Sequence, residues 1–88
     1  SKYFSNFTSV FATGFYQNKH IQKLDIEIPI QFYGTAEITG FTQYITGLML
    51  NHLPLDLNVT VSITSVNGPE VLIVKEPNSD EPFVHIYE

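Results

Sequence analysis

The three histidines, His20, His52 and His85, are the side chains in this sequence best suited to act as bases or metal ligands near neutral pH. Their spacing along the chain fits no metal-binding motif. His52 stands out because we expect it at the C-terminal end of a helix, on the apolar side, where the helix dipole favours an imidazolium. We therefore name His52 and Tyr44 as catalytic candidates, although a histidine that caps carbonyls or fills a core edge is the more ordinary interpretation.

A pair of carboxylates, Asp25 and Glu27, also has a spacing that could do chemistry. Residues two apart on a strand project from the same face about 7 Å apart, a separation that suits paired carboxylates in a glycosidase-like arrangement. Lys23 lies on the same face, and the alternate residues between them are apolar. We therefore expect an ordinary solvated strand face here rather than a catalytic pair.

Several classes of function are excluded by residues that the sequence lacks. There is no cysteine, so disulfides and thiolate zinc sites are ruled out. All four basic residues are lysines, and without the planar fork of arginine nucleic-acid binding is not expected. The chain contains no nucleophile elbow, phosphate loop, dinucleotide fingerprint or calcium loop. We therefore expect no cofactor and no metal, and the sequence favours a non-enzymatic protein over an enzyme.

The 88 residues predict a single domain, 1–88, with a thin core, since a chain of this size buries only about 60–65% of its unfolded surface. The hydrophobic fraction of 43% is too high for disorder, and no apolar run approaches the roughly 20 residues of a membrane span. The sequence also lacks cysteine and a signal peptide at its start, so we expect a soluble, cytoplasmic protein. The net charge of −5 comes essentially from the part that begins at Asp56, which suits a solvated surface or a basic partner.

Two segments, Ile21 to Tyr33 and Leu55 to Val66, alternate apolar and polar residues with a period of two and predict half-buried strands. A turn at Asn67-Gly68 leads to a strand that is apolar at both its odd and its even positions. Residues 83–88 are expected to form a short closing strand at an edge. Residues 2–17 carry an aromatic side chain at every fourth position, which suits a helix or a strand, and their composition favours a strand.

Residues 38–50, ITGFTQYITGLML, fail the strand pattern and fit a helix over about 35–52. Thr35 is the expected N-cap, Glu37 suits the positive end of the helix dipole, and Leu53-Pro54 ends the helix. At about 100° per residue one face becomes apolar, with Tyr44 at its edge. The residues of this face are Ile38, Phe41, Ile45, Leu48 and Met49.

The opposite face of this helix is small and smooth, because Ala36, Gly40 and Gly47 fall together on it. One interpretation is that exposed glycines are simply tolerated, at about 1 kcal/mol each relative to alanine. The other is that the bare stripe lets a second subunit approach the helix backbone. The sequence leaves both interpretations open.

These elements predict a two-layer α+β domain in the order β-β-α-β-β-β, with a curled antiparallel sheet packed on one central helix; the alternative is an all-β barrel. A thirteen-residue strand spans roughly 43 Å, more than the diameter of about 30 Å expected for a compact chain of this length. The long strands must therefore coil and bulge, with Pro29 as a break, or project and pair with another subunit.

The first and last strands have few charges to prevent edge pairing, so we predict a homo-oligomer, most simply a two-fold dimer. The function that fits best is a small non-enzymatic interaction or assembly protein, of a bacterial or viral accessory type, with a possible protein partner. The alternative is a small-ligand-binding protein or small enzyme with a cleft between helix and sheet or between subunits. The predicted interface residues are Ala36, Gly40, Gly47, Phe83, His85 and Tyr87.

Overall fold

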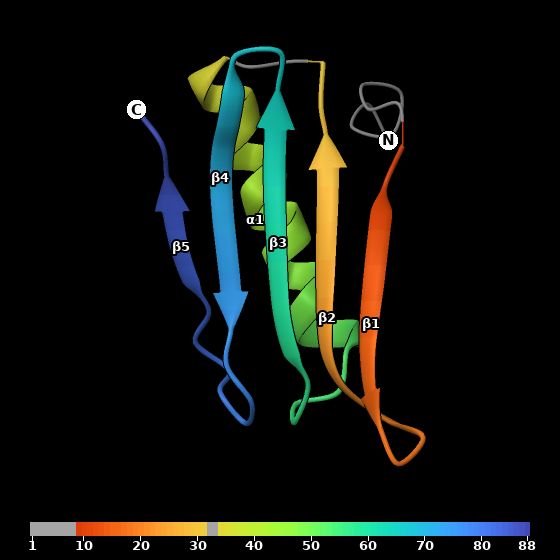
Figure 1. The fold of residues 1–88 in the computed structure, drawn as a ribbon. Helices are drawn as coiled ribbons and strands as arrows, with labels where there is room; N and C mark the ends of the chain where they lie inside the picture. The colour runs from red at the N-terminus through yellow and green to blue at the C-terminus, as the bar shows by residue number, and fades with distance from the viewer. Residues whose placement is uncertain (1–8, 32–33) are drawn as a thin grey trace.

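The computed structural model describes residues 9–31 and 34–88, and these form one sheet and one helix (Figure 1). α1 lies across one face of the sheet, which we call the inner face, and the opposite face is the outer face. The elements are β1 (Phe11–Gln17), β2 (His20–Pro29), α1 (Thr35–His52), β3 (Asn58–Ser65), β4 (Gly68–Lys75) and β5 (Phe83–Ile86).

The strands lie side by side in sequence order, β1-β2-β3-β4-β5. The pairs β1–β2, β3–β4 and β4–β5 are antiparallel, and β2–β3 is parallel. The predicted α+β class, two layers and element order are therefore confirmed, with one correction: the sheet is mixed rather than wholly antiparallel. The reason is that α1 carries the chain back along the sheet before β3 begins, which makes a right-handed crossover between parallel neighbours possible.

The sheet is open, which overturns the alternative of a barrel. Within the described residues β1 pairs only with β2 and β5 pairs only with β4, so both outer strands keep a free edge. The predicted conflict between strand length and molecular diameter is resolved in two ways. β2 ends at Pro29, and the body is elongated, with extents of 41 × 25 × 23 Å.

The N-terminal aromatic segment is a strand, as predicted, where the structure describes it, because Phe11 and Phe15 belong to β1. Tyr3 and Phe7, the other two aromatic positions of the pattern, lie outside the described residues. β1 turns into β2 through Asn18 and Lys19, whose φ angles of 53° and 66° give the left-handed pair that tight hairpins require.

The core lies between α1 and the inner face. Alternation along β3 buries Val59, Val61 and Ile63 completely, and the aligned residues Val71 and Ile73 of β4 are as deeply buried. Lys75 continues the same row of β4 and is only 1% exposed. Its Nζ donates hydrogen bonds to the carbonyls of Leu55, at 2.7 Å, and Glu76, at 3.1 Å, so the buried ammonium is satisfied and holds the chain between α1 and β3.

α1 covers the range predicted for it, but its buried face is turned slightly from the predicted one. Thr42 is buried, whereas Leu48 is 36% exposed. The Thr42 hydroxyl donates to the carbonyl of Ile38 at 2.7 Å, so the threonine is satisfied within the helix and can enter the core. The predicted N-cap is also corrected, because Gly34 precedes the helix in extended conformation and no side-chain cap is present.

Candidate functional site

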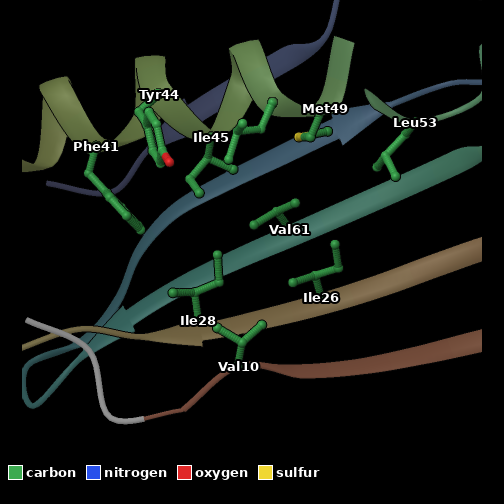
Figure 2. A pocket seen from close by; sticks show the side chains of 10 residues that line it. Val10, Ile26, Ile28, Phe41, Tyr44, Ile45, Met49, Leu53 and Val61 are labelled. Atoms are coloured by element: carbon green, nitrogen blue, oxygen red, sulfur yellow. The ribbon is translucent and has the colours of Figure 1, made fainter. Parts of the chain in front are cut away.

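An apolar groove lies between α1 and the β1–β2 side of the sheet, with a volume of about 230 Å³ (Figure 2). The side chains point toward one another from the helix above and from the strands below. The lining residues are Val10, Ile26, Ile28, Phe41, Tyr44, Ile45, Leu48, Met49, Leu53 and Val61.

The floor of the groove follows from the parallel pairing of β2 and β3. Ile26 lies beside Val61 in the register, and Ile28 is one alternation further on, so all three point to the inner face. The roof is formed by helix residues spaced three and four apart, including Phe41 and Ile45. The helical spacing of the roof and the alternation of the floor strands both direct apolar side chains into the groove. Its walls therefore contain almost no polar atoms.

The groove stays open because β1 contributes little volume on its inner face. Ala12 and Gly14 pair with Ile26 and Leu24, and neither carries a side chain long enough to reach α1. A methyl group at Gly14 would lie 3.1 Å from Cε1 of Tyr16, so this glycine makes room for that ring. The β1 side of the domain consequently exposes apolar surface that a larger side chain would have filled.

The chemistry available in the groove is burial of apolar groups. Apart from the phenol of Tyr44, its lining side chains are hydrocarbon or thioether, which favour hydrophobic contact and contribute no charge. Its volume is below the roughly 300–1,000 Å³ of a typical drug-sized site. The groove suits a few apolar side chains or a short acyl chain.

The two catalytic candidates do not come together in the groove. Tyr44 lines the groove, which is where a cleft between helix and sheet would place it. His52 is the last residue of α1, is exposed, and is not part of the lining, so the predicted position on the apolar side is wrong. Met49 of the same final turn is buried in the core, so this turn packs on the sheet and His52 lies on its solvent side.

The other histidines and the carboxylate pair lie on the surface. Nε2 of His20 is 3.6 Å from the carboxylate of Asp56, with both side chains more than half exposed, which makes a weak surface contact. His85 packs its ring edge-on against Tyr87, with ring centroids 4.6 Å apart. Asp25 and Glu27 lie on the outer face as predicted. Across residues 9–31 and 34–88 no group of three potential metal ligands lies close enough together to hold an ion.

The predicted interface residues fall on different surfaces. Gly47 lines a second groove, of about 490 Å³, between α1 and β5, and a methyl group placed there would meet no atom within 4 Å. Val84 and Ile86 form the β5 side of this groove, whereas Phe83 and His85 point to the outer face. Alternation along β5 separates the two sets, because successive residues of a strand point to opposite faces of the sheet.

The remaining residues of the small helix face are Ala36, which is exposed, and Gly40, which is half-buried. Neither lines the grooves described here. Sequence reasoning missed Thr42, Thr46 and Leu50 as walls of the β5 groove, because threonine in a helix gives no signal for burial until its hydroxyl is paired within the helix.

No described helix is long and apolar enough to cross a membrane.

Comparison with known proteins supplies the family. A family model described as "CamS sex pheromone cAM373 precursor" matches residues 1–81. The chain belongs to the CamS family. Among curated proteins no sequence matches the chain.

Solved structures of the CamS family have the same fold. A sex pheromone staph-cAM373 precursor is 34% identical with a TM-score of 0.87 over 98% of this chain, and a sex pheromone precursor from Lactobacillus salivarius subsp. salivarius UCC118 is 30% identical with a TM-score of 0.83 over 91%. The C-terminal domain of the Staphylococcus aureus staph-cAM373 precursor is 39% identical with a TM-score of 0.72 over 81%. This chain covers only 30%, 24% and 22% of those three chains, respectively.

Proposed function

We propose that this CamS domain is a non-enzymatic interaction and assembly module that forms a homodimer through β1. The observation that carries this proposal is the position of β1, which within residues 9–31 and 34–88 has no further strand on its outer side and lies directly beside the open apolar groove. All seven residues of β1 are exposed, and Phe11 and Tyr16 are 58% and 68% exposed.

The occupant that suits this edge is β1 of a second copy. A free edge presents unpaired backbone donors and acceptors, and a strand of seven residues offers about 24 Å of it. β1, FATGFYQ, contains no charged residue, so two copies of a chain with a net charge of −5 meet there without direct repulsion. Antiparallel pairing of β1 with itself uses the edge of both partners and gives a closed, two-fold assembly.

The groove supports the same arrangement. Val10 lies at its mouth, 48% exposed, and Ala12 and Gly14 form the low wall between the groove and the free edge. Side chains of a second β1, paired along this edge, would cover the open side of the groove and remove its apolar surface from water. The free energy of association would then come from both the backbone pairing and the covered groove.

The relatives are described as sex pheromone precursors, and their chains are more than three times as long as this one. We extend that description to this chain as part of the proposal. The domain would be one part of a longer pheromone precursor, and its role there would be to provide a surface for protein binding. Because a pheromone acts between cells, this description favours an exported protein over the cytoplasmic location expected from the sequence. Fractionation of the producing cells with an antibody to this domain tests the location.

Sedimentation equilibrium at micromolar concentration tests the dimer, with Ala12→Asp as the disruptive variant. The substitution places a carboxylate in the apolar surface that a second β1 would cover, and the dissociation constant should rise by about tenfold or more. Val84→Asp is the matched control, because Val84 is an exposed inner-face residue of the opposite edge strand. A monomeric wild type, or equal effects of the two substitutions, would contradict the proposal.

A second candidate function rests on the groove itself, which has the size and lining for a small apolar ligand. Titration with octanoate, followed by displacement of a fluorescent anilinonaphthalene sulfonate probe, tests it. Leu48→Lys places a charge at the mouth of the groove and should abolish displacement, while Leu55→Lys, at an exposed position outside the groove, should leave it unchanged. Loss of the octanoate effect in both variants, or in neither, would exclude a ligand site in the groove.

A further inference from the structure

Val10 lies at the mouth of the apolar groove, and the described part of the chain begins one residue before it. Its side chain is 48% exposed, and Figure 2 shows it on the strand side of the groove, below Ile28 in the view. Residues 1–8, which lie outside the described residues, are joined to Val10 through Ser9 alone. The groove therefore opens close to a further segment of the same chain.

The segment that precedes Val10 is rich in aromatic residues and nearly free of charge. Its sequence is SKYFSNFT, in which Tyr3, Phe4 and Phe7 are aromatic and Lys2 is the single charged side chain. None of the described residues that line the groove is charged. Contact between residues 3–8 and the groove would remove apolar surface from water on both sides without desolvating a charged side chain.

The volume of the groove fits one aromatic ring. In proteins, a cavity of about 150 Å³ lined by aliphatic and aromatic side chains is large enough to bind benzene. The groove measures about 230 Å³. It can therefore take one phenylalanine side chain of the segment, but it is too small for all three aromatic side chains together.

The phenylalanines of the segment are close enough along the chain to reach the groove. Phe7 is three residues from Val10, or at most about 10 Å of extended chain, and Phe4 is six residues away, or at most about 20 Å. The body measures 25 and 23 Å along its two shorter axes. Either ring can span the required distance, and Phe7 does so while fewer residues lose their conformational freedom.

The pairing of β1 with β2 ends just before this segment. Phe11 opposite Glu27 is the outermost pair, and the same register carried two residues further would bring Ser9 opposite Pro29, the last residue of β2. Proline has no backbone N–H, so the ladder lacks a donor at that point. The described pairing of β1 therefore does not require the residues before Val10 to continue along β2.

A segment attached beside the groove also has an advantage over a separate molecule. A short flexible connection gives an effective concentration of about 1 mM, whereas a second copy or a free ligand at micromolar concentration is about a thousandfold more dilute. An apolar side chain from the same chain should consequently occupy the groove before an external one does.

We propose that residues 1–8 fold back over Val10 and place the ring of Phe7 in the groove. The segment is then an internal occupant that competes with external apolar ligands for the same space. The backbone edge of β1, Phe11–Gln17, remains available to a second copy, so this inference does not depend on the proposed dimer.

Nuclear Overhauser spectroscopy of the full, isotope-labelled chain tests the contact directly. We expect cross-peaks between the Phe7 ring and the methyl groups of Ile28 and Ile45, which line the groove. The methyl groups of Ile86, in the groove beside β5, should give none with this ring. A mixture of labelled and unlabelled chains separates contacts within one chain from contacts between chains. Absence of the Phe7 cross-peaks, or cross-peaks that arise only between chains, would overturn the proposal.

Phe7→Ser tests the competition, with Phe83→Ser as the matched control, because Phe83 is 59% exposed on the outer face of β5. A groove that is filled for about nine-tenths of the time binds an external probe about tenfold more weakly than an empty one. Phe7→Ser should therefore bind anilinonaphthalene sulfonate about tenfold more tightly than the wild type, and Phe83→Ser should bind it as the wild type does. Equal affinity of Phe7→Ser and the wild type, or an equal gain in both variants, would overturn the proposal.

A double variant shows whether the gain arises in the groove. Leu48→Lys places a charge at the mouth of the groove, so adding it to Phe7→Ser should abolish the tighter probe binding. Thermal unfolding followed by circular dichroism verifies that each variant is folded at the temperature of the titration. A gain that persists in the double variant would place the probe outside the groove and overturn the proposal.

Discussion

On the inner face of the sheet Val61 and Ile63 are fully buried beneath α1, whereas Ser62, which lies between them in β3, is half-buried on the outer face. The two faces of one strand thus belong to different environments. The inner face carries the packing that holds the domain together, and the outer face carries polar groups that are at least partly open to solvent. Substitutions at neighbouring positions should therefore differ sharply in their effect on stability.

The largest expected difference is between two phenylalanines. Phe41 is 1% exposed in the core and Phe83 is 59% exposed on the outer face of β5. Phe41→Ala should lower the free energy of unfolding by about 3–5 kcal/mol, because it leaves a cavity beneath α1. Phe83→Ala should change it by about 0.5 kcal/mol or less. Urea unfolding followed by circular dichroism measures both, and similar losses would mean that β5 packs against something on its outer face.

Two lysines extend the comparison to charged groups. Lys75→Met should destabilise the domain by about 1–3 kcal/mol, because it leaves the carbonyls of Leu55 and Glu76 without their donor. Lys23→Met on the outer face removes only exposed contacts and should cost about 0.5 kcal/mol or less. Thermal unfolding at fixed pH compares them. A Lys75→Met variant as stable as the wild type would mean that the buried ammonium contributes no net stability.

Gly47→Ala tests the side of α1 that faces β5. A methyl group there meets no atom within 4 Å, so the substitution should raise stability by about 0.5–1 kcal/mol through helix propensity alone. If the bare stripe of α1 is instead a contact between subunits, the same substitution should weaken self-association. Sedimentation of Gly47→Ala beside Ala12→Asp distinguishes the stripe of α1 from the edge of β1 as the dimer surface.

The smallest effect is expected at His52. Its side chain is exposed at the end of α1 and is not part of the groove, so His52→Ala should change stability by about 0.5 kcal/mol or less and leave probe binding in the groove unchanged. Tyr44→Phe is the companion variant, because Tyr44 lines the groove. Loss of probe binding in His52→Ala with an unchanged melting temperature would return His52 to the list of functional residues.

Local pattern was enough to predict the element order, the range of α1 and the inner rows of β2 and β3. Alternation identified Val59, Val61 and Ile63 as buried because a strand turns successive side chains to opposite faces whatever its neighbours are. It could not predict that β2 and β3 are parallel neighbours, since the same alternation fits either direction of pairing. The expectation of a wholly antiparallel sheet failed at that point.

The candidate site was predicted only in outline. A cleft between helix and sheet and the presence of Tyr44 in it follow from the two apolar faces, but the groove's open side depends on Ala12 and Gly14 lying beside Ile26 and Leu24. Small residues in an aromatic segment indicate nothing until the register is known. The same holds for Thr42, which is buried only because its hydroxyl is satisfied by Ile38, and for Leu48, which α1 leaves at the mouth of the groove.

By itself the sequence determined which residues form strands and helix and which side of each is apolar, because those properties depend on neighbours a few positions away in the chain. Tertiary structure alone decided strand direction, the edges at which the described sheet ends, and the open groove beside β1. Those features arise from residues far apart in the chain, and their placement depends on how α1 crosses the sheet rather than on any local pattern.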